Sequence, residues 1–178
     1  IGCKVNKDKK KIHIIVQARL ESTRLPNKIL KIINKKTIIK TLFDRLKSSK
    51  LIDKIIFAIP KNIKNDELKK YIKKNRFENL YEGSSENVLS RYYGAAKKFS
   101  SDIIVRITAD CPLIDTKLLD QMIKKFIESN VNYLSNTLSP TYPDGYDIEI
   151  FDFETLKKTF KNAKKKLDKE HVTLYIKK

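Results

Sequence analysis

Cations and hydroxyl groups gather in one short polar stretch near the start of the chain. The stretch QARLESTRLPNK, residues 17–28, lies between two apolar runs and contains Arg19, Ser22, Thr23, Arg24 and Lys28. A triphosphate carries several negative charges, and phosphoryl transfer is catalysed mainly by positioning and charge neutralisation, so these residue types suit a triphosphate site. The spacing fits neither GxxxxGK[ST] nor GxGxxG, which excludes the two standard phosphate-binding loops. From charge alone, a basic surface loop on a basic protein is the simpler interpretation.

A carboxylate stands at the end of a second apolar run. In RITADCPLID, Asp110 comes where the run stops and Pro112 follows. If both runs are parallel strands, their carboxyl ends meet at one edge of the sheet, so Asp110 is expected beside the basic stretch. A carboxylate next to a triphosphate is what Mg²⁺ requires, and without the ion it would repel the phosphates. An isolated Asp at a strand end is otherwise a cap or a turn residue.

Two further acidic residues occur in PDGYDIEIF. Asp147 and Glu149 are two positions apart on a predicted strand and therefore face the same side. If that side faces the crevice, both complete the coordination of the metal. For Glu149, a solvent-facing strand edge is an equally good interpretation.

Apolar runs alternate with helical patterns along the whole chain, which is typical of an α/β protein with a largely parallel sheet. The segments with strand character are 11–18, 54–60, 77–83, 102–110, 132–137 and 147–151. The segments with helical periodicity are 37–49, 65–75, 85–99 and 116–129, followed by two more near the C-terminus. Asn65 is the predicted N-cap of the second helix. No repeat or linker is evident, so residues 1–178 are expected to form a single domain.

The formal charge of +18 is the most conspicuous feature of the composition. A strongly basic chain can bind nucleic acid, an anionic membrane or a polyanionic substrate. The excess is nearly all lysine and is spread over several predicted elements, whereas base readout favours arginine, so we expect no nucleic-acid partner. No run reaches the ~20 apolar residues of a membrane helix, and no secretory cleavage site is visible, so we expect a cytoplasmic protein without a membrane partner.

Cysteine and histidine give no sign of chemistry. Cys3 and Cys111 show neither CxxC spacing nor nearby histidines, so neither a zinc site nor a disulfide framework is indicated. His13 lies in a predicted strand and His171 in a predicted terminal helix, and we interpret both as structural.

Several motifs resemble those of one family, the cytidylyltransferases that include spore coat polysaccharide biosynthesis protein F. QARLESTRLPNKIL resembles the family's ARxxSTRLPGK, and VRITADCPLID its VRITGDCPLID. EGSSENVLSRYYGAA is similar to GSxxDVLxRYYxAA, YPDGYDIEIF to YPDGxDVEVF, and KEHVTLYI to REHVTPYI. These motifs span almost the whole chain in the family's order. More distantly, the chain is similar to the synthetases that activate KDO and sialic acids with CMP.

The resemblance implies a three-layer, Rossmann-like nucleotide-diphosphosugar transferase fold of the glycosyltransferase-A type. The implied reaction moves CMP from CTP to a sugar and releases pyrophosphate, with Mg²⁺ as cofactor, and related synthetases commonly form homodimers. By motif match, the nucleotide-binding residues are Ala18, Arg19, Ser22, Arg24, Lys28, Ser85 and Asn87, and the metal ligands are Asp110 and, by looser analogy, Asp147. A sugar-nucleotide enzyme or glycosyltransferase that uses another nucleotide, and a basic nucleic-acid-binding protein, are the alternatives.

The chain departs from the family pattern at three places. Asn27 replaces the glycine before Lys28; asparagine tolerates positive φ better than most residues, so the turn is expected to survive. Asn87 stands where the family has Asp. The sequence stops at TLYIKK, where family members continue, so a missing C-terminal segment is expected.

Overall fold

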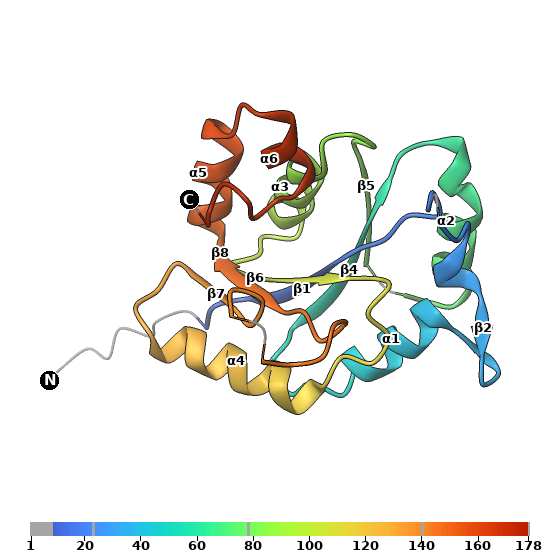
Figure 1. Ribbon diagram of the computed structural model, residues 1–178, viewed down its shortest axis with the longest axis horizontal. Helices are drawn as coiled ribbons and strands as arrows, with labels where there is room; N and C mark the ends of the chain where they lie inside the picture. The colour runs from blue at the N-terminus through green and yellow to red at the C-terminus, as the bar shows by residue number, and fades with distance from the viewer. Residues whose placement is uncertain (1–8, 23, 78, 140, 178) are drawn as a thin grey trace, which may run out of the picture.

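A six-stranded sheet with the strand order β5-β4-β1-β6-β8-β7 forms the centre of the protein (Figure 1). The structure is a computed structural model, and it describes residues 9–22, 24–77, 79–139 and 141–177. Cys3 and Thr23 lie outside these ranges.

Four neighbouring strands of the sheet are parallel. β1 (Ile12–Gln17) lies between β4 (Lys54–Pro60) and β6 (Ile103–Thr108), and β5 (Asn79–Gly83) pairs with β4. β8 (Glu149–Asp152) runs antiparallel to β6, and β7 (Tyr133–Ser135) runs antiparallel to β8. The predicted mostly parallel sheet is therefore confirmed. The three central strands read as continuous apolar runs because helices cover both of their faces.

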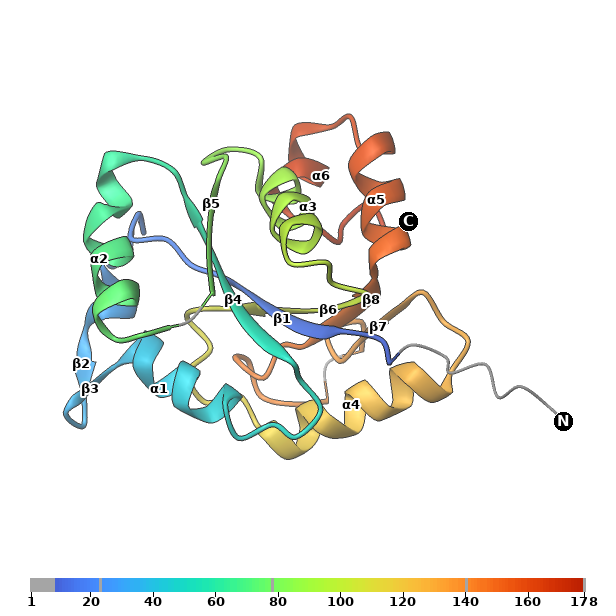
Figure 2. The same ribbon diagram turned by 180° about the vertical axis from the view of Figure 1, so that it is seen from behind.

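Helices cover both faces of this sheet, which confirms the predicted three-layer arrangement (Figures 1 and 2). α1 (Ile38–Leu46), α2 (Asp66–Lys74) and α4 (Thr116–Glu128) lie on one face. α3 (Val88–Lys98), α5 (Phe153–Asn162) and α6 (Lys166–Glu170) lie on the other. Side chains alternate along each strand, so Ile14 and Val16 belong to an apolar cluster on the α1 side and Ile15 to a separate cluster on the α3 side.

The order in which the strands are added to the sheet reverses at β1. From β1 the chain proceeds to β4 and β5 on one side, and then returns to β6 on the other side of β1. The connections that leave the carboxyl ends of β1 and β6 therefore diverge. Ligands of open α/β sheets bind in the crevice at such a reversal of strand order.

Some elements differ from the prediction. The segment after the polar stretch, for which nothing was predicted, contains a 3₁₀ turn, η1 (Lys28–Leu30), and a hairpin of β2 (Ile32–Ile33) and β3 (Lys36–Thr37). A second 3₁₀ turn, η2 (Ile63–Asn65), precedes α2. The strand expected over 147–151 begins only at Glu149. The four helices predicted between 37 and 129 are shorter than expected by one to four residues.

Three predictions for single residues can be compared with the structure. His13 lies in β1, as predicted, and its Nδ1 is 2.8 Å from the Ser101 hydroxyl. His171 follows α6 at its C-cap and does not lie within a helix, which corrects the prediction. Asn65 occupies the N-cap position of α2, but its side chain makes no capping hydrogen bond, so the predicted capping role is wrong.

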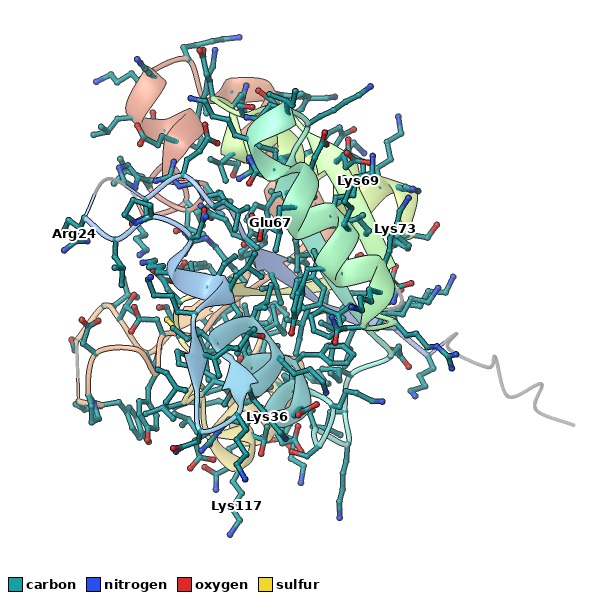
Figure 3. The ribbon with its side chains drawn as sticks, turned by 90° about the vertical axis from the view of Figure 1, so that its right-hand side faces the viewer. Arg24, Lys36, Glu67, Lys69, Lys73 and Lys117 are labelled. Atoms are coloured by element: carbon teal, nitrogen blue, oxygen red, sulfur yellow. The ribbon has the colours of Figure 1, made fainter. Side chains whose placement is uncertain are left out.

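Lysine side chains project outward from separate elements. Figure 3 shows this for Lys36, for Lys73 on α2 and for Lys117 on α4. This dispersal agrees with solvated helix faces. Among the described residues, no helix is both long enough and apolar enough to cross a membrane.

Candidate active site

The polar stretch after β1 and the acidic residue after β6 meet at one edge of the sheet. Gln17 and Thr108, the last residues of their strands, are register partners in the parallel pairing of β1 with β6. The Nζ of Lys28 lies 2.5 Å from Oδ2 of Asp110. The sequence-based expectation that these two residues share one edge is confirmed.

Lys28 reaches this position because the chain turns back sharply before it. Asn27 has φ 55° and ψ 23°, a left-handed conformation that asparagine adopts more readily than most residues. Its backbone N–H donates to the Leu20 carbonyl over 3.1 Å, which closes the loop, and η1 then begins at Lys28. The turn expected at Asn27 is thus present.

A cleft of about 510 Å³ lies between the two loops. Its lining residues are Gln17, Arg19, Glu21, Ser22, Arg24, Lys28, Ile29, Thr108, Ala109 and Asp110. Three cations and two carboxylates therefore face one hollow. The volume is within the range of small-molecule sites, and the cationic side suits an anionic ligand.

The predicted residues of the polar stretch do not all have the same relation to the cleft. Arg19, Ser22, Arg24 and Lys28 line it, and Figure 3 shows Arg24 projecting from the outer part of its loop. Ala18 is only 2% exposed and belongs to the apolar core, while its N–H donates to the Ala58 carbonyl. Its side chain therefore packs in the core and does not line the cleft.

Ser85 and Asn87 lie in the loop after β5 and have protein partners. The Ser85 hydroxyl accepts a hydrogen bond from Asn62 Nδ2 over 3.0 Å. Asn87 is the N-cap of α3, and its Oδ1 accepts from the Ser90 N–H over 2.9 Å. The side-chain oxygen of Asn87 is therefore already engaged in capping α3.

Asp147 and Glu149 line a neighbouring pocket of about 470 Å³ on the α6 side of the sheet. Arg106, Thr137, Leu167, His171, Thr173, Leu174 and Lys177 complete its lining. The two acidic residues thus share a side, as predicted, but they are not part of the lining of the Lys28–Asp110 cleft. The two sites are nevertheless linked, because Arg106 lines this pocket and its Nη2 lies 3.4 Å from the Gln17 amide oxygen in the cleft lining.

Glu149 is a buried carboxylate that forms ion pairs with two cationic side chains. Its side chain is 4% exposed and pairs with Arg106, its cross-strand partner on β6. Tyr133, Thr173 and Lys177 also donate to it, over 2.6, 2.7 and 2.9 Å. Burial alone would raise the pKa of Glu149, but the Arg106 charge and these donors lower it to about 2. Both oxygens already have protein partners, and metal ligation by Glu149 would have to displace them.

The pKa values of Asp110 in the cleft and of Asp147 in the neighbouring pocket shift in opposite directions. Burial raises the pKa of Asp110, but hydrogen bonds from Lys28 and Thr108 and the Lys28 charge outweigh it, so the pKa lies below the ordinary value. For Asp147, burial and the nearby Asp144 and Glu149 charges raise the pKa. Asp110 is accordingly held ionised.

Several residues of the site were not recognised in the sequence. Gln17, Glu21, Ile29 and Thr108 line the cleft, and Asn62 and Asn65 hold its loops. Gln17 and Thr108 could have been found, since the last residues of neighbouring parallel strands face the crevice. The partners of Asn62 and Asn65 lie in distant parts of the chain, and no local signal indicates them.

The reversal of strand order and the cleft beside it define an α/β protein of the class that binds ligands at the carboxyl ends of its parallel strands. The family model described as "Cytidylyltransferase" matches residues 13–178. The chain therefore belongs to the cytidylyltransferase family.

A characterised relative and a solved structure agree with this membership. Spore coat polysaccharide biosynthesis protein SpsF of Bacillus subtilis is 31% identical over 170 residues, which cover 93% of this chain and 69% of that protein. A solved cytidylyltransferase from Leptospira borgpetersenii serovar Hardjo-bovis has a TM-score of 0.89 at 36% identity, over 94% of this chain and 71% of that one.

A more distant structure confirms the fold. The CMP:2-keto-3-deoxy-manno-octonic acid synthetase complexed with CTP has a TM-score of 0.69 at 14% identity, over 94% of this chain and 84% of that one. The fold is thus the nucleotide-diphosphosugar transferase fold, as the resemblance implied.

Proposed function

We propose that this protein is a Mg²⁺-dependent nucleotidyltransferase that moves CMP from CTP to a sugar and releases pyrophosphate, for the synthesis of a surface polysaccharide or glycan. One observation carries the proposal: the Lys28–Asp110 pair spans a cationic cleft at the carboxyl ends of β1 and β6. Membership of the cytidylyltransferase family supports CTP as the nucleotide. The spore coat relative supports a role in polysaccharide synthesis.

The cations of the cleft have separate tasks in this proposal. Arg19 and Arg24 bind the triphosphate, with the Ser22 hydroxyl as a further donor, and Ser85 and Asn87 approach the ribose or the base. Lys28 exchanges its Asp110 partner for the phosphates. Its charge then stabilises the pyrophosphate as the bond between the α-phosphorus and the bridging oxygen breaks. A sugar oxygen forms the new bond to the α-phosphorus.

The residues of the cleft fit Mg²⁺ bound together with a nucleotide. Mg²⁺ prefers oxygen ligands, keeps several waters and is usually held by one or two carboxylates plus substrate phosphates. Asp110 supplies a half-exposed carboxylate with a lowered pKa. Within the described ranges no group of three or more His, Cys, Asp or Glu side chains could hold a metal ion, so a site completed by phosphates is the form that suits this chain. Bound there, the ion would neutralise the phosphates.

Asp147 is the second carboxylate of the proposed metal site. It is exposed, and the Asp110 charge acts on it. Glu149 contributes indirectly, because it holds Arg106, which in turn is 3.4 Å from the Gln17 amide oxygen in the cleft lining. We place the acceptor sugar in the pocket that Asp147 and Glu149 line, beside the nucleotide.

Three other expectations stay predictions. A homodimer is expected from related synthetases, and a cytoplasmic location from the sequence. No nucleic-acid partner is expected, because the cationic side chains project from separate elements.

Pyrophosphate release from CTP over a panel of sugars, with Mg²⁺ present, tests the proposal. Thermal protection by CTP, UTP, ATP and GTP would identify the preferred base, since a ligand stabilises the state that binds it. Protection by another nucleotide in place of CTP would favour a different sugar-nucleotide enzyme. Salt-dependent retention of DNA without any nucleotide binding would instead indicate a nucleic-acid-binding protein.

A further inference from the structure

One side-chain amide is buried behind the cleft without acting as a helix cap. Asn65, where η2 meets α2, is 1% exposed. Its Oδ1 accepts from the Leu20 backbone N–H over 2.9 Å, and its Nδ2 donates to Glu21 Oε2 over 3.1 Å. Nδ2 also donates to Asn62 Oδ1 over 2.7 Å. A buried amide with both ends bonded across 44 and 45 positions of the chain fixes the backbone that it contacts.

The network extends to a third loop. Asn62 Nδ2 donates to the Ser85 hydroxyl over 3.0 Å and lies 3.4 Å from Glu21 Oε2. The loops after β1, β4 and β5 are therefore joined at the edge where the nucleotide is proposed to bind. The Lys61 N–H donates to the Gly83 carbonyl over 2.8 Å and adds a backbone link between the second and third of these loops.

The flanking residues explain what this network would position. Leu20 is anchored twice, by its buried side chain and by its N–H on Asn65. Arg19 and Ser22, on either side of the held segment, line the cleft. A displacement of about 1 Å at a reacting site can cost roughly 10²-fold in rate, so a fixed backbone here would keep Arg19 and Ser22 in the positions that the proposed reaction requires.

We propose that Asn65 is a positioning residue of the nucleotide site: its amide holds Leu20 and Glu21 and thereby sets Arg19 and Ser22 against the triphosphate. This inference rests on the proposed function. An amide is required because one end must accept from a backbone N–H and the other must donate to a carboxylate. Aspartate has nearly the same shape but presents a second acceptor to Glu21.

Asn65→Asp tests this requirement with little change in volume. The introduced carboxylate repels Glu21, so the affinity for CTP, measured by calorimetry, is expected to fall about 10-fold or more, as for the loss of a hydrogen bond to a charged group. Asn75→Ala is the matched control. Asn75 is an amide at the opposite end of α2, where its Nδ2 donates to the Tyr71 carbonyl of the same helix. CTP affinity in this control is expected to stay within about twofold of the wild type.

Exchanging the donor and acceptor roles of residues 65 and 21 should restore CTP affinity. In the Glu21→Gln background the new side chain can donate to the carboxylate introduced by Asn65→Asp, so this substitution is expected to cost clearly less CTP affinity there than in the wild type. Equal losses in the two backgrounds, or an equal loss in Asn75→Ala, would overturn the inference.

Hydrogen exchange tests the anchoring without any nucleotide. Asn65→Ala removes the acceptor of the Leu20 N–H, so exchange over residues 18–22 is expected to accelerate about tenfold relative to the wild type, while α4 serves as a reference for global stability. Unchanged exchange at Leu20 would sink the inference. A wild-type protein that binds no CTP would contradict the proposed function, and the exchange comparison would still decide the anchoring.

Discussion

Lys28 and Asp110 are 82 positions apart in the chain, and yet Lys28 Nζ lies 2.5 Å from the Asp110 carboxylate at the mouth of the cleft. Their side chains are 29% and 42% exposed. A pair this exposed contributes little to folding, typically about 0–1 kcal/mol, so a ligand can separate it at low cost. When a nucleotide and a metal ion bind, the phosphates can therefore replace Asp110 as the partner of Lys28, and the metal ion can replace Lys28 as the partner of Asp110.

Lys28→Ala is expected to lower kcat/KM for CTP by about 10²-fold or more, since a preorganised charge at the leaving group is removed. The free energy of unfolding is expected to change by less than about 1 kcal/mol. Pyrophosphate release and urea denaturation measure the two effects. Lys31→Ala, at an exposed position three residues further on, is the control and is expected to leave turnover unchanged.

Asp110→Asn is expected to raise the Mg²⁺ concentration required for half-maximal turnover and to lower the maximal rate, because the proposed site loses its ionised carboxylate. Titration of Mg²⁺ into the chelator-treated enzyme measures both. Glu67→Gln, an exposed carboxylate on α2 (Figure 3), should behave as the wild type. Full turnover by Asp110→Asn at the wild-type Mg²⁺ requirement would remove Asp110 from the metal site.

Glu149→Gln is expected to destabilise the fold by about 3–5 kcal/mol, because Arg106 and Lys177 lose the negative charge that holds them. Denaturant unfolding gives the free energy. Glu154→Gln is the control: Glu154 pairs with Lys157 at an exposed position, and its loss should cost less than about 1 kcal/mol. Equal stability of the two variants would show that the Glu149 cluster is energetically neutral.

Low pH should weaken the same ion pairs of Glu149 with Arg106 and Lys177. The pKa of Glu149 is lowered from 4.5 to about 2, so its stabilisation is fully present above pH 4.5 and is lost as the pH falls toward 2. The contribution is on the order of 3 kcal/mol, since each pKa unit corresponds to about 1.4 kcal/mol. Unfolding free energies measured between pH 2 and 5 should fall more steeply for the wild type than for Glu149→Gln. Parallel curves would contradict the assigned pKa.

The central strands and the Lys28–Asp110 meeting could be predicted because each depends on one general rule. Strands buried on both faces read as apolar runs, and parallel strands end at a common edge, so the residues that follow β1 and β6 had to approach each other. The left-handed turn at Asn27 also follows from the residue type. These features need no knowledge of distant partners.

Features that depend on long-range pairing could not be predicted. Asn65 has the local pattern of a helix cap, but its partners Leu20 and Glu21 lie on another loop. Glu149 reads as a strand-edge acid until β8 is known to pair with β6, which places it opposite Arg106. The hairpin of β2 and β3 was missed because two-residue strands are too short to show a period.

The sheet divides the core into two apolar clusters, and the cleft rests on only one of them. Ile29 and Ala109 of the cleft lining belong to the cluster on the α1 side, whereas the other cluster, with Leu89 and Leu156, contributes none of that lining. Efforts to make the enzyme more heat-resistant should therefore begin around Leu156 on α5, a residue of the second cluster that lines neither the cleft nor the pocket of Asp147 and Glu149.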